Sequence, residues 1–294
     1  MSFRVEHYAD PADFLRVARP FLSDRRHETI RGLVWGLANM NLRWPAAHGV
    51  TARTWTLHDA EDAVVGAFFW TPPRSVMLTD LPEGSGAHVL NALAPVLSSA
   101  ADPRAPGWHG PERSVAIVSD AWTGPLVETL RFLLYRCDGV TRSPDVDGRL
   151  RLATLDDLVL CDEWGHAFMT ETGLGEAHRP PPSMRPNVES ERLFLWESNG
   201  EPTACALWSR PTRRSASIGF VFVPPERRGR GYAGAVTAAL TTHLMTRAGK
   251  AYTTLFTDAS NPVTNHLYPS LGYALVTPYV EIGPPRDASE WVHP

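Results

Sequence analysis

Apolar residues recur along this chain with a period near two in some segments and near 3.6 in others, which separates predicted strands from predicted helices. In the first half, the pattern predicts helices over residues 11–22, 27–40, 88–98 and 125–135, and strands over 53–57, 63–71 and 114–119. In the second half, it predicts strands over residues 149–153, 193–197, 203–208, 215–223, 252–257 and 274–282, and helices over 154–169, 231–248 and 264–271. Because helices and strands are mixed in both halves, the sequence predicts an α/β fold of the α+β kind.

Two polar stretches interrupt this pattern. The stretch Val140–Gly148 has the composition of a linker. Domains contain about 100–200 residues, so we predict an N-terminal domain over residues 1–143 and a C-terminal domain over residues 144–294. The stretch Thr170–Glu191 is rich in Pro, Gly and Glu and predicts a long loop.

The two halves share short matches in the same order, around similar predicted elements. The matched segments are 67–72 with 205–210, 119–121 with 257–259, and 134–139 with 267–272. The first two matches have the same offset of 138 positions (205 − 67 and 257 − 119), and the third has an offset of 133 (267 − 134). The matches predict a duplicated domain, and chance similarity between two α/β units is the alternative.

Composition and charge exclude several classes of protein. The net charge is −4 with a pI near 6.3, whereas a general nucleic-acid binder is basic. The three cysteines, Cys137, Cys161 and Cys205, are widely spaced, which favours a reducing compartment over a disulfide framework. No CxxC or HExxH pattern predicts a metal site. The sequence shows no signal-peptide pattern and no apolar run of about 20 residues, so we expect a cytoplasmic protein without membrane contact.

The most informative segment is a strand that runs into a turn rich in glycine and arginine, followed at once by a predicted helix. The strand ends with Val221-Phe222-Val223, and the turn reads Arg228-Gly229-Arg230-Gly231-Tyr232-Ala233. Glycines allow several backbone N–H groups to point into one concavity, and a helix N-terminus adds positive partial charge. The segment therefore predicts a site for a phosphate or a pyrophosphate.

A dinucleotide-binding motif is one alternative for this segment. Gly229, Gly231 and Gly234 satisfy GxGxxG, and Asp258 lies downstream. However, Asp258 follows Gly231 by 27 positions (258 − 231), longer than the roughly 20 expected. The preceding strands also predict an antiparallel meander and not the start of a βαβ unit. A nucleoside triphosphatase loop is excluded because GxxxxGK[ST] is absent.

The second half resembles the GCN5-related N-acetyltransferase (GNAT) family. The family's pyrophosphate loop has the pattern [QR]-x-x-G-x-[GA], which residues 228–233 match in full. Downstream the family has an Asn, a short helix ending in Tyr, and L-G-[FY]; this chain has Asn261, Asn265, Tyr268 and Leu271-Gly272-Tyr273 in that order. The resemblance covers about residues 149–282. In the first half, the corresponding loop carries Glu83 in place of the arginine, so that half resembles a degenerate copy.

The resemblance implies a fold and a role for each matched residue. The fold is a mixed, mostly antiparallel sheet flanked by helices, here in two tandem copies. Residues 221–223 hold the acyl carbonyl and the pantetheine arm, residues 228–233 hold the pyrophosphate, and Asn261 contacts the pantetheine amides. The residues implied to bind coenzyme A are Val221, Phe222, Val223, Arg228, Gly229, Arg230, Gly231, Tyr232, Ala233, Asn261 and Asn265.

The resemblance also implies the catalytic groups. Tyr268 protonates the departing thiolate, and the ordinary pKa values of a phenol near 10 and a thiol near 8.5 allow this. The general base is open between Glu197, on the second predicted strand of the domain, and Glu171, at the end of its first helix.

The function that we expect is transfer of an acetyl group from acetyl-CoA to an amine of a small molecule or peptide, by direct attack in a ternary complex and without a metal. Two alternatives keep the fold: a longer acyl-CoA or an aminoacyl-tRNA as donor, or a module that binds coenzyme A without catalysis. An NAD(P)-binding oxidoreductase is the third alternative. Acidic net charge argues against nucleic acid, except for a donor carried on tRNA. The sequence leaves the oligomeric state open.

Overall fold

The computed structural model describes residues 2–41, 52–71, 74–97, 107–172 and 183–285. The chain forms two compact units. The N-terminal unit runs to Leu133 and includes a second segment that begins at Thr277, and the C-terminal unit comprises Leu134–Val276. The predicted linker, residues 140–148, belongs to the C-terminal unit, where it has neither helical nor strand conformation.

The N-terminal unit is built on a mixed sheet with the strand order β1-β2-β3-β4-β5-β12. Its strands are β1 (Arg4–Tyr8), β2 (Arg53–His58), β3 (Val64–Trp70), β4 (Val76–Leu78), β5 (Trp108–Pro111) and β12 (Ala274–Gly283). Neighbouring strands are antiparallel except β4 and β5, which are parallel. Its helices are α1 (Pro11–Leu22), α2 (Glu28–Asn41), α4 (Gly86–Leu97) and α5 (Glu112–Ser119).

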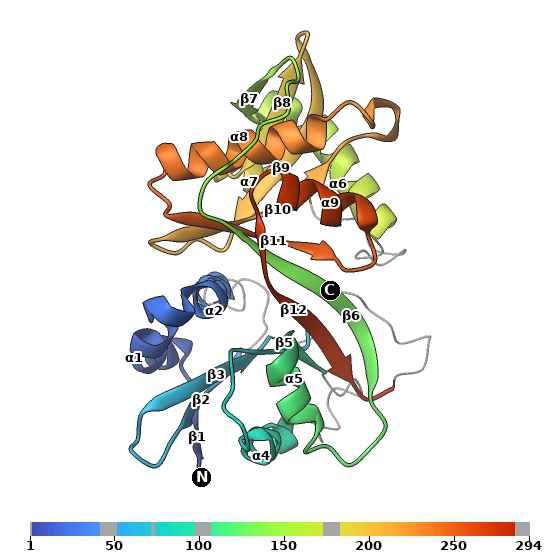
Figure 1. Cartoon of the computed structure of the whole chain (residues 1–294). Coiled ribbons are helices and arrows are strands. Elements are labelled where there is room, and N and C mark those ends of the chain that lie inside the picture. The colour runs from blue at the N-terminus through green and yellow to red at the C-terminus, as the bar shows by residue number, and fades with distance from the viewer. Residues whose placement is uncertain (1, 42–51, 72–73, 98–106, 173–182, 286–294) are drawn as a thin grey trace. The chain divides into compact units, whose positions relative to one another are not determined.

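Helices cover both faces of this sheet (Figure 1). Along β3 the side chains alternate between the two faces, as strand geometry requires. Ala67 and Phe69 pack with buried residues of α1 and α2, whereas Phe68 and Trp70 pack with buried residues of α4 and α5. The unit therefore has two hydrophobic cores, one on each side of the sheet.

The C-terminal unit has the strand order β6-β11-β10-β9-β8-β7. Its strands are β6 (Val127–Cys137, which begins in the N-terminal unit), β7 (Arg149–Leu152), β8 (Leu193–Ser198), β9 (Glu201–Ser209), β10 (Ser215–Phe222) and β11 (Tyr252–Asp258). From β7 to β10 the pairing is antiparallel, and β10 and β11 are parallel. Asn199 and Gly200, both with positive φ, make the tight turn between β8 and β9.

The helices of the C-terminal unit also lie on both faces of its sheet. They are α6 (Leu158–Thr172), α7 (Arg185–Glu189), α8 (Tyr232–Thr246) and α9 (Pro262–Ser270). On β8, Phe194 and Trp196 pack with α8, and Leu193 and Leu195 pack with α6 and α7. Thr154 and Asp157 form a capping box before the first helix of this unit.

Both units contain the same succession of elements, which supports the predicted duplication. The order strand, two helices, three strands, helix, strand, helix, strand runs from β1 to β6 and again from β7 to β12. The match of residues 67–72 with 205–210 pairs β3 with β9, which occupy the same place in this order. The other two matches were wrong, because they pair the end of α5 with the end of β11, and β6 with α9.

Two predicted elements are of the wrong type. Residues 114–119, predicted as a strand, lie in the helix α5, where Val115 and Val118 are fully buried on one helical face. Residues 125–135, predicted as a helix, lie mostly in the strand β6, although Glu128 and Arg131 have helical spacing and form an ion pair. Short apolar runs do not distinguish the two periods, and here tertiary packing decided the outcome.

Short elements were missed altogether. The strands β1, β4 and β5 have five, three and four residues, too few to show a period. The helix α7 lies within the segment predicted as a long loop, and the middle of that segment, residues 173–182, is outside the described residues.

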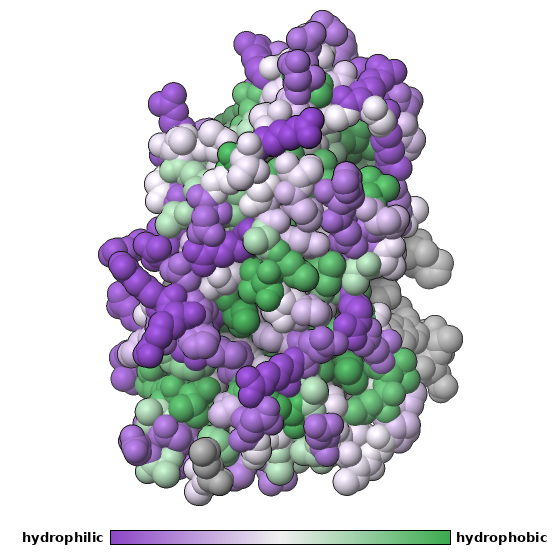
Figure 2. All heavy atoms as spheres, viewed as in Figure 1, coloured by the Kyte–Doolittle hydropathy of each residue, from purple (hydrophilic) through white to green (hydrophobic). Residues whose placement is uncertain are grey.

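None of the helices that the structure describes is long and apolar enough to cross a bilayer. Figure 2 shows polar and charged side chains over much of one face, with apolar side chains in smaller groups.

Candidate active site

The two parallel strands of the C-terminal unit separate before they end. The register between β10 and β11 runs from the pair Ser215–Tyr252 to the pair Ile218–Leu255. Both strands then continue, β10 to Phe222 and β11 to Asp258, without a further pair between them in this part of the described chain. Backbone N–H and C=O groups along this edge of β10 therefore lack a strand partner, and an extended ligand with amide groups can supply one.

A β-bulge lies on β10 at the point of separation. Gly219 is opposite Leu207 of β9 and Phe222 is opposite Cys205, so β10 has one residue more than β9 between the two pairs. Phe220 takes the extra place with a φ of 47°, a left-handed conformation that costs a bulky residue energy. Bulges bend a strand and redirect its groups, and they are frequent next to active sites.

Contacts on the α6 side hold this bulge in place. The ring of Phe220 meets the ring of Phe168 of α6 edge-on, with 4.9 Å between centroids. Phe222 is 4% exposed and lies 6.0 Å from Trp164, measured between ring centroids. Val221 and Val223 alternate with Phe222 and pack partly against the core that faces α8. Of the three residues predicted to hold the acyl group, Val221 and Phe222 thus form the bulged end of β10, and Val223 follows it directly.

The loop after β10 has the conformation that its glycines predict. Gly229 and Gly231 have φ angles of 75° and 81°, in the left-handed region. A Cβ on Gly229 would meet nothing within 4 Å, so the space in front of the loop is open. Gly231 is the N-cap of α8, and no side chain among the described residues caps that helix. The first N–H groups of α8, on Tyr232 and Ala233 among others, are therefore free for an anion.

Arg228 is held at the mouth of this loop by two contacts. Its Nε donates to the carbonyl of Val223 at 2.9 Å, and its Nη2 donates to Oε2 of Glu171 at 2.6 Å. The side chains of Arg228 and Glu171 are 44% and 51% exposed. Arg230 is also exposed and has no ion pair with any described residue. Two guanidinium groups therefore flank the loop, and one of them already binds a carboxylate.

The two asparagines of the motif have different surroundings. Asn261 is the N-cap of α9, because its Oδ1 accepts from the N–H groups of Val263 and Thr264 at 3.1 and 3.3 Å. Asn265 donates from Nδ2 to the carbonyls of Asp258 and Ala259. These bonds fix the orientation of the Asn265 amide, whose Oδ1 is buried without a hydrogen-bond partner among the described residues. An amide N–H of a pantetheine arm matches this acceptor chemically.

Tyr268 lies near the end of α9 and is 6% exposed. Burial raises the pKa of its phenol to about 12, with no contribution from a hydrogen bond to another described residue. Its ring packs edge-on against Tyr273 at 6.0 Å between centroids, and the Tyr273 hydroxyl bonds to Thr241 and Thr253. Tyr268 is therefore a fixed, fully protonated phenol at neutral pH, the form that a general acid requires.

Residues 161–273 match the family model described as Acetyltransferase (GNAT) family. The matched segment includes the bulged β10, the glycine loop, α8 and Tyr268. Residues 161–273 form a GNAT domain. A search of curated proteins gave no significant match.

Solved structures extend the GNAT fold over nearly the whole chain. An acetyltransferase of the GNAT family from Colwellia psychrerythraea has a TM-score of 0.58 and 15% identity, over 95% of this chain and 98% of its own. A GCN5-related N-acetyltransferase from Sphaerobacter thermophilus has a TM-score of 0.58 and 16% identity, over 96% and 95%. A tandem GNAT protein from the clavulanic acid biosynthesis pathway has a TM-score of 0.56 and 14% identity, over 97% and 100%. At this identity the likeness shows the fold, and it includes the N-terminal half.

Glu197, one of the two candidate bases, lies on β8 in the GNAT domain. Arg149 donates to its Oε1 at 2.7 and 3.0 Å, and Arg151 donates to its Oε2 at 2.6 Å. These bonds, from Arg149 first and Arg151 second, lower the pKa of the Glu197 carboxyl. A carboxylate held in this way binds a proton weakly, which is unfavourable for a base. The other candidate, Glu171, lies at the loop after β10, beside Arg228.

The prediction that this loop does not start a βαβ unit was wrong. The segment β10–α8–β11 does contain parallel strands joined by a helix, so the loop opens a βαβ unit. Only the strands before β10 form the expected antiparallel meander. Asp258, the candidate ribose ligand, accepts on Oδ1 from the N–H and the hydroxyl of Ser260, both at 2.7 Å, and so stabilises its own turn.

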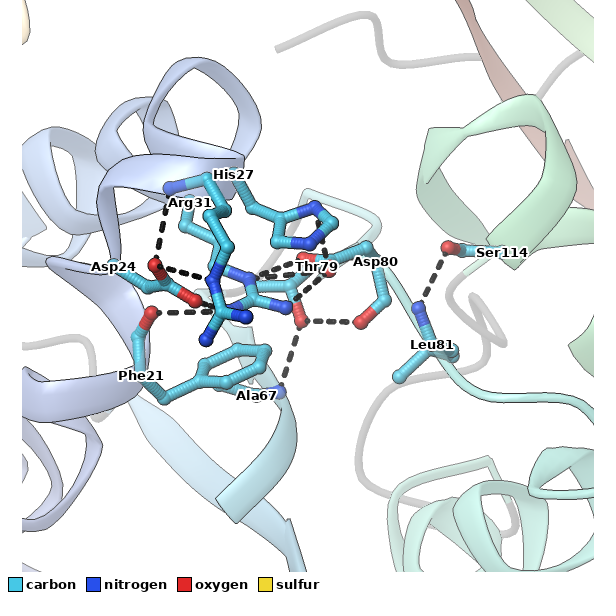
Figure 3. A network of polar contacts seen from close by, with 10 residues as sticks. Phe21, Asp24, His27, Arg31, Ala67, Thr79, Asp80, Leu81 and Ser114 are labelled. Carbon is cyan, nitrogen blue, oxygen red and sulfur yellow. Dashed lines mark hydrogen bonds and ion pairs between the residues drawn. The ribbon is translucent and has the colours of Figure 1, made fainter.

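The N-terminal unit carries an ion-pair network in the corresponding place, after the parallel strand β4 (Figure 3). Arg31 of α2 binds both carboxylate oxygens of Asp80, with Nη2 at 2.6 Å from Oδ2 and Nε at 2.9 Å from Oδ1. Its Nη1 bonds to Asp24 at 3.2 Å, and its guanidinium lies 3.8 Å from the Phe21 ring centre. Further along the loop, Glu83 pairs with Arg113. This loop therefore presents two carboxylates where the GNAT domain presents arginines.

Proposed function

We propose that the GNAT domain transfers an acetyl group from acetyl-CoA to an amine of a small molecule or a peptide, by direct attack in a ternary complex. The observation that carries this proposal is the opening between β10 and β11, which has unpaired backbone groups at the bulge and an uncapped helix at the glycine loop. One extended ligand with amides at one end and a pyrophosphate at the other satisfies both.

Each part of the opening then has a task. The backbone of residues 221–223 binds the acyl carbonyl and the first pantetheine amide. Asn261, at the exposed start of α9, contacts the pantetheine amides, and Asn265 holds the preceding turn through Nδ2. The N–H groups of residues 229–233 and the guanidinium of Arg228 bind the pyrophosphate, and Arg230 adds positive charge. When bound, acetyl-CoA supplies the thioester that the amine attacks.

Tyr268 is the proposed general acid. Its pKa of about 12 keeps the phenol protonated, and the apolar surroundings that raise this pKa also disfavour a free thiolate beside it. Proton transfer from the phenol to the departing sulfur gives a neutral thiol and leaves the negative charge on the Tyr268 phenolate. The proton that the attacking amine releases then restores the neutral phenol. The base that deprotonates the amine is not assigned, and the substitution Glu197→Gln tests the candidate Glu197.

A panel of amines with detection of released thiol tests the proposal. We expect acetyl transfer to at least one amine, together with thermal stabilisation by coenzyme A and none by NAD or NADP. A ligand that binds only the folded state raises the melting temperature. Stabilisation by NAD or NADP without stabilisation by coenzyme A would refute the acyltransferase proposal. Binding of coenzyme A with no turnover on any amine would instead favour a non-catalytic module.

A further inference from the structure

Each unit holds an arginine–carboxylate ion pair beside the loop that follows its first parallel strand. In the N-terminal unit, Arg31 and Asp80 form the pair, and their side chains are 11% and 27% exposed (Figure 3). In the C-terminal unit, Arg228 and Glu171 form it, with 44% and 51% exposed. The first pair is bidentate and supported by Asp24, whereas the second has a single hydrogen bond, between Nη2 and Oε2. The second pair is therefore the one that a competing anion can open.

We propose that the Glu171 carboxylate binds the Arg228 guanidinium in the free protein, and that the pyrophosphate of coenzyme A binds the same guanidinium in the complex. Binding of coenzyme A then exchanges one anion for the other. Glu171 is then a residue that sets the affinity of the site, and not a base. This inference rests on the proposed function, since it requires coenzyme A at the glycine loop.

The geometry allows the exchange with little movement of the arginine. The bond from Nε of Arg228 to the Val223 carbonyl, at 2.9 Å, anchors the guanidinium beside the loop whichever anion it binds. Only the partner of Nη2 has to change. On the other side, the contact of Phe168 with Phe220 holds α6 against the bulge, which keeps Glu171 within reach of the same arginine.

In the competition for the Arg228 guanidinium, the pyrophosphate binds more strongly than Glu171, but Glu171 still weakens the binding of coenzyme A. An exposed ion pair contributes little, because water and salt screen it. A pyrophosphate carries more negative charge than a carboxylate, and its oxygens also accept hydrogen bonds from the free N–H groups at the start of α8. Because the ion pair of Arg228 with Glu171 has to break, the free energy of binding coenzyme A is less favourable by the energy of that pair. Removing the carboxylate charge therefore strengthens binding.

The experiment is a calorimetric titration of the full chain with coenzyme A and with pantetheine, which lacks the pyrophosphate. We expect Glu171→Gln to bind coenzyme A roughly two- to fivefold more tightly than the wild type, the range for an exposed ion pair. Pantetheine affinity should not change. Glu163→Gln is the matched control, because Glu163 is an exposed carboxylate of the same helix with no ion pair among the described residues, and it should not alter either affinity.

A double variant separates exchange from simple charge repulsion. In an Arg228→Ala background, Glu171→Gln should have no further effect, because the shared guanidinium is gone. An equal gain in both backgrounds would overturn the exchange, as would unchanged or weaker binding by Glu171→Gln alone. Failure of the wild type to bind coenzyme A at all would instead remove the proposed function on which the inference rests.

Discussion

Tyr268 is mostly buried, and its hydroxyl has no hydrogen-bond partner among the described residues, so its replacement by phenylalanine removes a proton donor and almost no volume. We expect Tyr268→Phe to keep its affinity for acetyl-CoA while kcat falls by about 10²–10⁴, the usual contribution of a general acid. The loss should appear in kcat and kcat/KM together, because the interaction forms only as the thiolate departs. Steady-state kinetics on the amine found in the panel provide the measurement.

Tyr273→Phe is the matched control for this prediction, because the two rings pack against each other. The Tyr273 hydroxyl bonds to Thr241 and Thr253, so its loss should lower stability by about 1–3 kcal/mol and leave turnover largely intact. If the two variants have similar turnover, Tyr268 is a packing residue and not the acid.

The pKa of Tyr268 also predicts the alkaline side of the pH profile. A general acid acts in its protonated form, so activity is lost as pH rises through its pKa, which burial raises to about 12. We therefore expect kcat/KM to stay constant up to about pH 10. At that pH a tyrosine of ordinary pKa would already be deprotonated in half of the molecules. A decline centred near pH 9 in the wild type, absent from Tyr268→Phe, would contradict this assignment.

Glu197 offers a test between a base and a structural carboxylate. A general base contributes about 10²–10⁴ to the rate. Because Arg149 and Arg151 hold both carboxylate oxygens and lower the pKa, we expect Glu197→Gln to reduce kcat less than about tenfold and to lower the melting temperature. Glu201→Gln, at an exposed carboxylate on the same hairpin, should change neither. A fall of 100-fold or more in kcat without loss of stability would restore Glu197 as the base.

At the scale of elements, the glycine loop is shaped by backbone conformation and not by packing. Alanine at Gly229 meets no neighbouring atom but must adopt a φ of 75°, which costs about 1–2 kcal/mol. A loop that relaxes this strain turns its N–H groups away from the ligand. We expect Gly229→Ala to weaken coenzyme A binding by about 5- to 30-fold, since 1.4 kcal/mol corresponds to a factor of ten.

Gly200 provides a control with the same backbone demand. It has a φ of 78° in the turn between β8 and β9, and a Cβ there also meets nothing within 4 Å. Gly200→Ala should therefore cost similar stability and leave coenzyme A affinity unchanged, as measured by calorimetry and thermal unfolding. Equal affinities for the two variants would show that the conformation of the loop does not matter for binding.

The loop and its two strands could be predicted from sequence because their signals are local. Glycines stand where φ is positive, an apolar strand precedes them, and a helix follows within a few residues. The bulge at Phe220 has no such signal, because the left-handed conformation is imposed by pairing with β9 and by contact with Phe168. The pair of Arg228 with Glu171 joins residues 57 positions apart, and only the packing of α6 brings them together.

Tertiary context also explains where the fold was mispredicted. The run Val115–Val118 is apolar and rich in β-branched residues, which favours a strand, yet two of its valines bury one face of the helix α5. The N-terminal unit shows the same order of elements as the GNAT domain although their sequences share almost no motif. The two units therefore share the succession of helices and strands, but the residues of their loops differ in chemistry.

At the scale of the whole molecule, the chain has two units of the same architecture and, we predict, one site for coenzyme A. In the N-terminal unit, Arg31 is committed to Asp80 and Asp24 and is only 11% exposed. Releasing it would leave two partly buried carboxylates without their partner, which is far more costly than opening an exposed pair. The same loop carries Glu83, a carboxylate paired with Arg113, where the GNAT domain has an arginine.

We therefore expect calorimetric titration to give one equivalent of coenzyme A per chain. The Arg228→Ala variant should bind more weakly with the same stoichiometry, and Gly229→Ala should do the same, because both changes lie in the single site. Arg31→Ala should lower the melting temperature without altering coenzyme A affinity, since it leaves two partly buried carboxylates unneutralised in a unit that we predict not to bind coenzyme A. Two equivalents in the wild type would show that the N-terminal unit also binds coenzyme A. One equivalent that is lost with Arg31→Ala and kept with full affinity in Arg228→Ala would place binding in the N-terminal unit and overturn the assignment of the site to the GNAT domain.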